Sequence, residues 1–214
     1  MIITIGGCKG GPGKTTTTVN LAVALALKGR DVLVIDADDQ LATSKWFSYR
    51  DEQQGVVEIN HAIAEGNISQ TLLNFRKKYE VILVDVAGGR TIELEAALKV
   101  SDLVLCPFEP SQLDLNTFPD FIQIIESAKV YNSKLKERFY LNRCAPLLTL
   151  DNQQEVVAAL EQMPEITLLK TRMYINKYFG KSFPLGLGVL EVPEATKAQD
   201  NFNDLINELM ESVI

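Results

Sequence analysis

Three glycines, two lysines and a threonine fall within seven consecutive residues near the start of the chain, from Lys9 to Thr15. Glycine allows backbone conformations that other residues avoid, so successive N–H groups in such a loop can converge on an anion. Lys14 adds a positive charge for the β and γ phosphates of a nucleotide, and the Thr15 hydroxyl can bind Mg²⁺. The residue types and their spacing therefore predict a phosphate-binding loop.

The segments on either side of this loop are those that such a loop needs. Residues 2–5 are a short β-branched run of the kind found in buried parallel strands. After the loop, apolar residues repeat at helical spacing from Val19 to Leu27. A helix that begins at the loop directs the positive end of its dipole at bound phosphates. We expect the nucleotide to contact Gly10, Gly11, Pro12, Gly13, Lys14, Thr15 and Thr16.

The rest of the chain predicts one α/β domain over residues 1–214. The chain is 46% apolar, long enough to build one large core, and no linker or repeat divides it. Further apolar strand candidates alternate with helical stretches, at residues 32–35, 81–84, 103–106, 139–141 and 166–169. This alternation predicts a single doubly wound, mostly parallel sheet with helices on both faces, as in P-loop NTPases. Ligands of such sheets bind beyond the carboxyl ends of the strands.

Carboxylates follow two of the predicted strands directly. Residues 32–35 run into Asp36 and Asp38, and residues 81–84 run into Asp85. A carboxylate at the tip of a buried strand beside a phosphate loop can hold the water shell of Mg²⁺ or orient an attacking water. The alternative is that each is only a polar strand end.

One position departs from the simple P-loop pattern, because Cys8 stands where its first glycine belongs and a second lysine, Lys9, follows. A lysine at the entrance of the loop points away from the phosphates of its own chain, so it makes most sense reaching a nucleotide held by a partner subunit. The run Lys-Gly-Gly-x-Gly-Lys-Thr resembles the deviant Walker A box of the ParA/MinD ATPases. The resemblance implies a homodimer that encloses ATP, with Lys9 crossing to the partner.

The resemblance extends to the carboxylates. Asp36 and Asp38 are similar to the Asp-x-Asp-x-Gln box of ParA proteins, which implies a place by the metal for Asp36 and positioning of the hydrolytic water by Asp38. Asp85 resembles the Walker B aspartate. The implied protein is a slow, partner-stimulated ATPase that uses ATP and Mg²⁺. Its catalytic residues would be Lys9, Lys14 and Asp38, and its metal-side residues Thr15, Asp36 and Asp85.

Two departures from many relatives are visible. Asp85 is followed by Val-Ala-Gly-Gly instead of threonine and two prolines, and Asp39 stands where a proline is common. The small ParF-type plasmid partition ATPases vary similarly after the aspartate. Residues 106–114 also resemble a segment of this subgroup, and residues 141–143 resemble the strand end that frames the base in ParA and MinD relatives. This implies base-side roles for Pro107, Asn142 and Arg143; stiffening of a loop by proline is the alternative. Residues 176–179 lack the aspartate of an Asn-Lys-x-Asp guanine motif, so we expect ATP rather than GTP.

ParA relatives ride on nucleoid DNA as ATP-bound dimers, and an adaptor on the cargo stimulates hydrolysis. The resemblance therefore implies a ParB-like or cargo-bound adaptor and non-specific DNA as partners, with a plasmid, chromosome or microcompartment such as a carboxysome as cargo. The net charge of −7 opposes DNA binding, but residues 129–181 carry nine Lys/Arg against five Asp/Glu. The candidate DNA contacts are Lys170, Arg172, Lys177 and Lys181; a solvated helix face is the alternative.

Two other functions remain open, a MinD-like membrane-associated ATPase and a metabolic or cofactor-assembly enzyme of the same fold. MinD relatives end in a basic amphipathic helix, whereas residues 200–213 here place four acids opposite an apolar face. We therefore expect a core-packing C-terminal helix and no stable membrane insertion. Scattered cysteines and the lack of a signal segment or long apolar run favour a cytoplasmic, nucleoid-associated protein. Residues 46–79 reveal little.

Overall fold

The computed structural model describes residues 1–7, 9–145, 150–163 and 166–213. Within these residues one six-stranded sheet has the order β3-β2-β4-β1-β5-β6, and every neighbouring pair of strands is parallel. The predicted single parallel sheet is confirmed. The strands are β1 (Ile2–Ile5), β2 (Val32–Ala37), β3 (Asn60–Ile63), β4 (Val81–Val86), β5 (Leu103–Phe108) and β6 (Lys136–Leu141).

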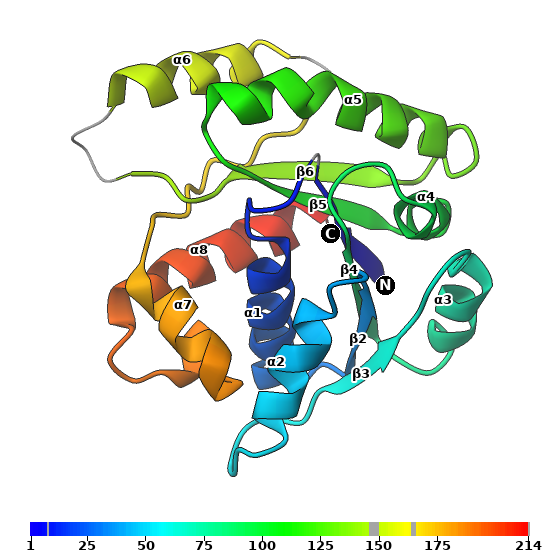
Figure 1. Cartoon of the computed structure of the whole chain (residues 1–214), viewed down its shortest axis with the longest axis vertical. Coiled ribbons are helices and arrows are strands. Elements are labelled where there is room, and N and C mark those ends of the chain that lie inside the picture. The colour runs from blue at the N-terminus through cyan, green and yellow to red at the C-terminus, as the bar shows by residue number, and fades with distance from the viewer. Residues whose placement is uncertain (8, 146–149, 164–165, 214) are drawn as a thin grey trace.

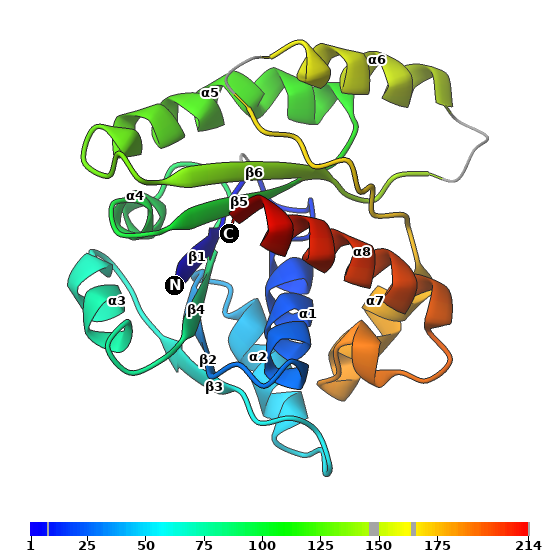
Figure 2. The same cartoon turned by 180° about the vertical axis from the view of Figure 1, so that it is seen from behind.

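Helices cover both faces of this sheet, as expected for a doubly wound fold (Figures 1 and 2). One core layer packs α1 (Lys14–Leu27), α2 (Ala42–Arg50), α7 (Lys177–Ser182) and α8 (Thr196–Val213) against the sheet. The opposite layer contains α3 (Ser69–Phe75), α4 (Ile92–Leu98), α5 (Gln112–Lys129) and α6 (Leu150–Glu161). Two short 3₁₀ turns, η1 (Phe183–Leu185) and η2 (Val189–Glu191), lie between α7 and α8.

The register of the central strands decides where the carboxylates meet. Asp36 on β2 pairs with Asp85 on β4, and Asp85 pairs in turn with Ile5, the last residue of β1. Because these strands are parallel, their carboxyl ends meet at one edge of the sheet. The loop that leaves β1 therefore starts directly beside both carboxylates.

One strand prediction was wrong and one strand was missed. Residues 166–169 form an isolated bridge, between Leu168 and Phe139 of β6, rather than a strand. The pairing is interrupted there because the backbone amide of Thr171 donates to the Glu208 side chain, and it resumes only where the Met173 amide donates to the oxygen of Leu141. The missed strand, β3, lies at the sheet edge and is largely exposed, so its sequence has no apolar run to reveal it.

The C-terminal helix packs as predicted. Phe202, Leu205, Ile206 and Leu209 of α8 are at most 2% exposed and belong to the core on the α1 side of the sheet. Its apolar face is thus covered by the protein itself. No helix in the described part of the chain combines the length and hydropathy needed to cross a bilayer.

Candidate functional site

The glycine loop connects β1 to α1 at the carboxyl edge of the sheet, where phosphate binding was predicted. Gly11 and Gly13 adopt φ of 104° and 100°, and α1 begins at Lys14 directly after them. The buried Lys14 ammonium donates to the backbone oxygen of Lys9 at 3.0 Å. The loop therefore curves over the side chain of Lys14, whose charge would attract a triphosphate.

Asp85 is a fully buried carboxylate beside the loop. Its Oδ2 accepts hydrogen bonds from the hydroxyls of Thr15 at 2.8 Å and Thr43 at 2.6 Å, whereas its buried Oδ1 has no hydrogen-bond partner among the residues that the structure describes. Burial raises the pKa of Asp85 to about 6, although both hydroxyl bonds act in the opposite direction. A buried carboxylate with an unused oxygen favours a cation, or water held by a cation, at that position.

Asp36 lies beside Asp85 and is held by the start of α2. Its Oδ2 accepts from the backbone N–H of Ser44 at 2.7 Å and from the Ser44 hydroxyl at 2.8 Å, and its Oδ1 accepts from the Asp38 N–H at 3.3 Å. Asp38 is only half-buried, and its carboxylate accepts from the N–H of Gln40 at 3.0 Å. The structure therefore places Asp36 inside the site and Asp38 at its open side.

Thr43 and Ser44 were missed by sequence reasoning. They occupy the first turn of α2, where one hydroxyl bonds Asp85 and the other bonds Asp36. Two adjacent hydroxyl residues shortly after the Asp-x-Asp-x-Gln segment were the available signal. The first turn of α2 thus fixes both carboxylates that face the loop.

The donor set fits Mg²⁺. Among the residues that the structure describes, no group of three or more His, Cys, Asp and Glu could hold a metal ion. Thr15, Asp36 and Asp85 instead offer oxygen atoms only, and Mg²⁺ prefers a few carboxylates together with waters and substrate phosphates to a cage made of protein ligands alone. The unused oxygen of Asp85 supplies an acceptor for such a metal-bound water.

Lys9 points to its own α5 in this structure. Its ammonium forms an ion pair with Asp114, and the lysine side chain is 30% exposed whereas that of Asp114 is 5% exposed. The other oxygen of Asp114 accepts from the backbone N–H of Glu109 at 3.0 Å. Asp114 was not among the predicted site residues. The Lys9 ammonium is therefore held by a residue of its own subunit.

Gly88 explains one of the departures from relatives noted in the sequence. A Cβ at this position would lie 2.3 Å from the carbonyl carbon of Lys9 and 2.5 Å from the nitrogen of Gly10. The following residue, Gly89, donates its N–H to the oxygen of Gly7 at 3.1 Å. The loop after β4 thus packs directly on the phosphate loop, and the contact leaves no room for a side chain.

A cavity of about 490 Å³ opens beside the glycine loop and α1. Asn142 and Arg143, at the end of β6, line it together with residues 173–176 and parts of α7, η1 and α8. Asn142 donates to the oxygen of Pro12 at 2.7 Å, and Arg143 donates to the oxygen of Gly11 at 3.4 Å. Both residues therefore brace the loop and also face the space where a base can lie.

Pro107 does not line this cavity. It is buried within β5, where it pairs with Tyr140 of β6 one position before the strand ends. The base-side role of Pro107 therefore stays a prediction from the resemblance, without support from this cavity. Tyr140 reaches the cavity instead, and its buried hydroxyl lies 2.5 Å from the Thr17 hydroxyl.

The four candidate DNA contacts are exposed and lie outside the glycine loop and carboxylate cluster. Lys170 and Arg172 belong to an irregular segment along α8, whereas Lys177 and Lys181 belong to α7. The backbone N–H of Lys170 donates to Glu208, so an acid lies next to the first of them. The alternative interpretation, a solvated helix face, applies only to Lys177 and Lys181, because Lys170 and Arg172 do not lie on a helix.

Comparisons with known proteins agree with this geometry. The family model of the CobQ/CobB/MinD/ParA nucleotide binding domain matches residues 3–184. The chain is 27% identical over 216 residues to the maintenance of carboxysome distribution protein A of Halothiobacillus neapolitanus, covering 98% of this chain and 96% of that protein.

Two solved structures share the fold. The ATP complex of a Cyanothece McdA variant has a TM-score of 0.78 at 16% identity, over 97% of this chain and 95% of that one. A putative plasmid partition protein of Borrelia burgdorferi bound to AMPPNP has a TM-score of 0.71 at 18% identity, over 97% and 99% of the two chains. At these identities the likeness is one of fold.

Proposed function

This chain belongs to the CobQ/CobB/MinD/ParA nucleotide-binding family, and on that premise we propose that it is a ParA-type ATPase that positions a cargo on DNA. The observation that carries the proposal is a glycine loop that lies beside two buried carboxylates and has a second lysine at its entrance. Lys14, Thr15 and Asp85 suffice for a mononucleotide. Lys9 is additional, and its ammonium is paired with Asp114 of its own subunit.

The cofactors of this activity are ATP and Mg²⁺. The triphosphate would lie along residues 10–16, with Lys14 beside the β and γ phosphates, and the base in the cavity bordered by Asn142 and Arg143. Thr15, Asp36 and Asp85 would hold Mg²⁺, which supplies charge neutralisation on the phosphate oxygens. Asp38, at the open side, would orient the attacking water.

Two copies of the chain would enclose the nucleotides. Phosphoryl transfer depends mainly on positioning and on neutralising charge, so a missing cation slows it strongly. Within one subunit Lys9 is paired with Asp114 and does not serve its own phosphate site. In the homodimer each Lys9 would leave Asp114 and reach the nucleotide of the partner. Hydrolysis would then be slow in the monomer and faster in the dimer when an adaptor is bound.

The proposed cargo is inferred from what the relatives are named for. One of them is named for maintaining carboxysome distribution, and a structural neighbour is a putative plasmid partition protein. For this chain we propose a plasmid, a chromosome or a protein microcompartment as cargo, a ParB-like or cargo-bound adaptor, and a cytoplasmic, nucleoid-associated location. Dimerisation would double the exposed basic set Lys170, Arg172, Lys177 and Lys181, and so convert a negligible DNA affinity into a usable one.

The test is binding to random-sequence duplex DNA by an Asp38→Ala protein, in which hydrolysis is blocked. Binding is measured across a salt series without nucleotide, with ADP and with ATP. We expect binding with ATP only, and a steep fall in affinity as salt rises. Absence of binding in every nucleotide state would refute the DNA step, and would favour a metabolic enzyme or a membrane-associated ATPase of the same fold.

A further inference from the structure

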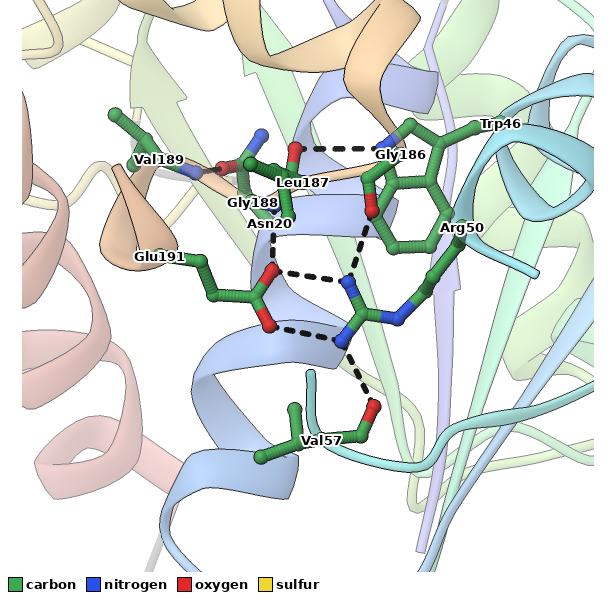
Figure 3. A network of polar contacts seen from close by, with 9 residues as sticks. All are labelled: Asn20, Trp46, Arg50, Val57, Gly186, Leu187, Gly188, Val189 and Glu191. Carbon is green, nitrogen blue, oxygen red and sulfur yellow. Dashed lines mark hydrogen bonds and ion pairs between the residues drawn. The ribbon is translucent and has the colours of Figure 1, made fainter. Parts of the chain in front are cut away.

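A buried ion pair far from the phosphate loop joins α2 to the segment between α7 and α8 (Figure 3). Arg50, the last residue of α2, donates to both carboxylate oxygens of Glu191, at 2.9 and 2.8 Å, and to the backbone oxygens of Gly186 and Val57. Its guanidinium also lies 5.0 Å from the centre of the Trp46 ring. We call Arg50, Glu191 and Trp46 the α2 clasp.

The clasp leaves little freedom of movement to the end of α2 or to the segment between α7 and α8. The Arg50 and Glu191 side chains are 4% and 10% exposed, and the second oxygen of Glu191 also accepts from the N–H of Gly188 at 2.9 Å. Gly186 has φ of 62°, and a Cβ there would lie 2.2 Å from the nitrogen of Arg50. Burial of two charges opposes folding unless the pair is well satisfied, so such a pair is better evidence for a fixed geometry than for extra stability.

The two ends of α2 contact different segments, the carboxylate cluster at its start and the segment between α7 and α8 at its end. Its first turn holds the carboxylates through Thr43 and Ser44, and its last residue is Arg50. Thr43 and Arg50 are seven residues apart, about 11 Å along a helix axis. A helix of two turns between two fixed ends moves as one body, so a shift at the carboxylates is passed on to the clasp.

The segment held by the clasp follows the wall of the cavity along the chain and does not line the cavity itself. Phe179 and Gly180 of α7 and Phe183 of η1 line the cavity, and Gly186 to Glu191 follow directly. Asn20 of α1 ties the same segment to the phosphate side, since its amide oxygen accepts from Val189 at 2.6 Å while its amide nitrogen donates to Thr16 at 2.8 Å. The phosphate side of the site and the segment after the cavity wall are thus connected twice, through α2 and through Asn20 of α1.

From these contacts we propose that Arg50 and Glu191 are positioning residues, which act through α2 to hold Thr43 and Ser44 against the metal-side carboxylates and couple the metal site to the cavity wall. The inference rests on the proposed nucleotide site and deepens it. It predicts that Mg²⁺ arriving at a nucleotide-bound protein changes the surroundings of residues 182–191, although the metal does not touch them.

Trp46, the only tryptophan of the chain, gives a direct readout. Its indole N–H donates to the oxygen of Leu187 at 3.4 Å, and the Arg50 guanidinium lies over its ring. The experiment adds Mg²⁺ to protein already saturated with ADP, so that the base is in place and only the metal arrives. Trp46 fluorescence and the hydrogen exchange of residues 182–191 are recorded through the titration.

In the native protein we expect a change in Trp46 fluorescence and slower exchange of residues 182–191 as Mg²⁺ is added. Arg50→Lys keeps the charge but loses the two-pronged contact, and we expect its Mg²⁺ midpoint to rise about ten-fold, as for residues that orient metal ligands. Glu191→Gln serves as the second variant and is expected to abolish the exchange response. The matched control is Arg76→Lys, which weakens the partly exposed Arg76–Asp102 pair outside the site.

Three results would overturn the inference. The first is that Mg²⁺ causes no response at Trp46 or residues 182–191 in the native protein. The second is that the Mg²⁺ midpoint is the same in the native protein and in both clasp variants. The third is that the Arg76→Lys control shifts the midpoint as much as the clasp variants do. Unchanged exchange of the core strands shows that each variant is folded. ADP binding, followed separately by equilibrium dialysis, distinguishes the two failures. Loss of ADP binding in the native protein refutes the proposed function, and intact ADP binding without the Mg²⁺ response refutes the clasp alone.

Discussion

Replacing Asp114 with asparagine is expected to strengthen ATP-dependent dimerisation. If Lys9 serves the nucleotide of a partner subunit, it must first leave Asp114, and the ion pair opposes the dimer. The pair joins a lysine that is 30% exposed to a carboxylate that is 5% exposed. We therefore take about 1 kcal/mol for each pair, the upper end of the range for exposed pairs. Two pairs are released in a symmetric dimer, so the dimer dissociation constant falls about thirty-fold.

Asparagine keeps the oxygen that accepts from the Glu109 N–H, so the substitution removes the charge and leaves the backbone contact. The dissociation constant is measured by sedimentation equilibrium with Mg²⁺ and ATP in an Asp38→Ala background. Asp120→Asn is the matched control, since Asp120 is exposed on the same helix and the charge change is identical. An unchanged or weaker dimer in the Asp114→Asn protein would show that the pair does not compete with dimerisation.

Three further predictions concern the site itself. Lys9→Ala is expected to leave nucleotide affinity within about two-fold by calorimetry while abolishing ATP-dependent dimers and hydrolysis; unchanged dimers would remove the role in the partner's site. Gly88→Ala places a Cβ 2.3 Å from the Lys9 carbonyl carbon, and overpacking of about 1–3 kcal/mol lowers nucleotide affinity roughly ten-fold or more; native affinity would contradict the contact. In metal-free protein the raised pKa of Asp85, about 6, means that the folded state keeps a proton that the unfolded chain releases near pH 4. The free energy of unfolding then falls by up to about 3 kcal/mol as pH rises from about 4 to about 6. Urea titrations at several pH values measure this free energy, and its fall with pH should be smaller in Asp85→Asn.

The sequence alone determined the chemistry of the phosphate side. A β-branched run, a glycine loop and an apolar helix are local patterns, so β1, the loop and α1 follow from neighbouring residues. Asp36 and Asp85 were also predictable, because a carboxylate directly after a buried parallel strand lies at the edge where the other strands end. Only the fold showed that the two are paired in register.

The tertiary structure decided the residues that act through contacts between distant segments. β3 was missed because an exposed edge strand needs no apolar run, and residues 166–169 were misassigned because the Thr171 amide, which would have continued the pairing, donates to Glu208. Two ion pairs, Lys9–Asp114 and Arg50–Glu191, each join residues about a hundred or more positions apart. No periodicity in the sequence records such a pair, because its partners meet only after the helices have packed on the sheet.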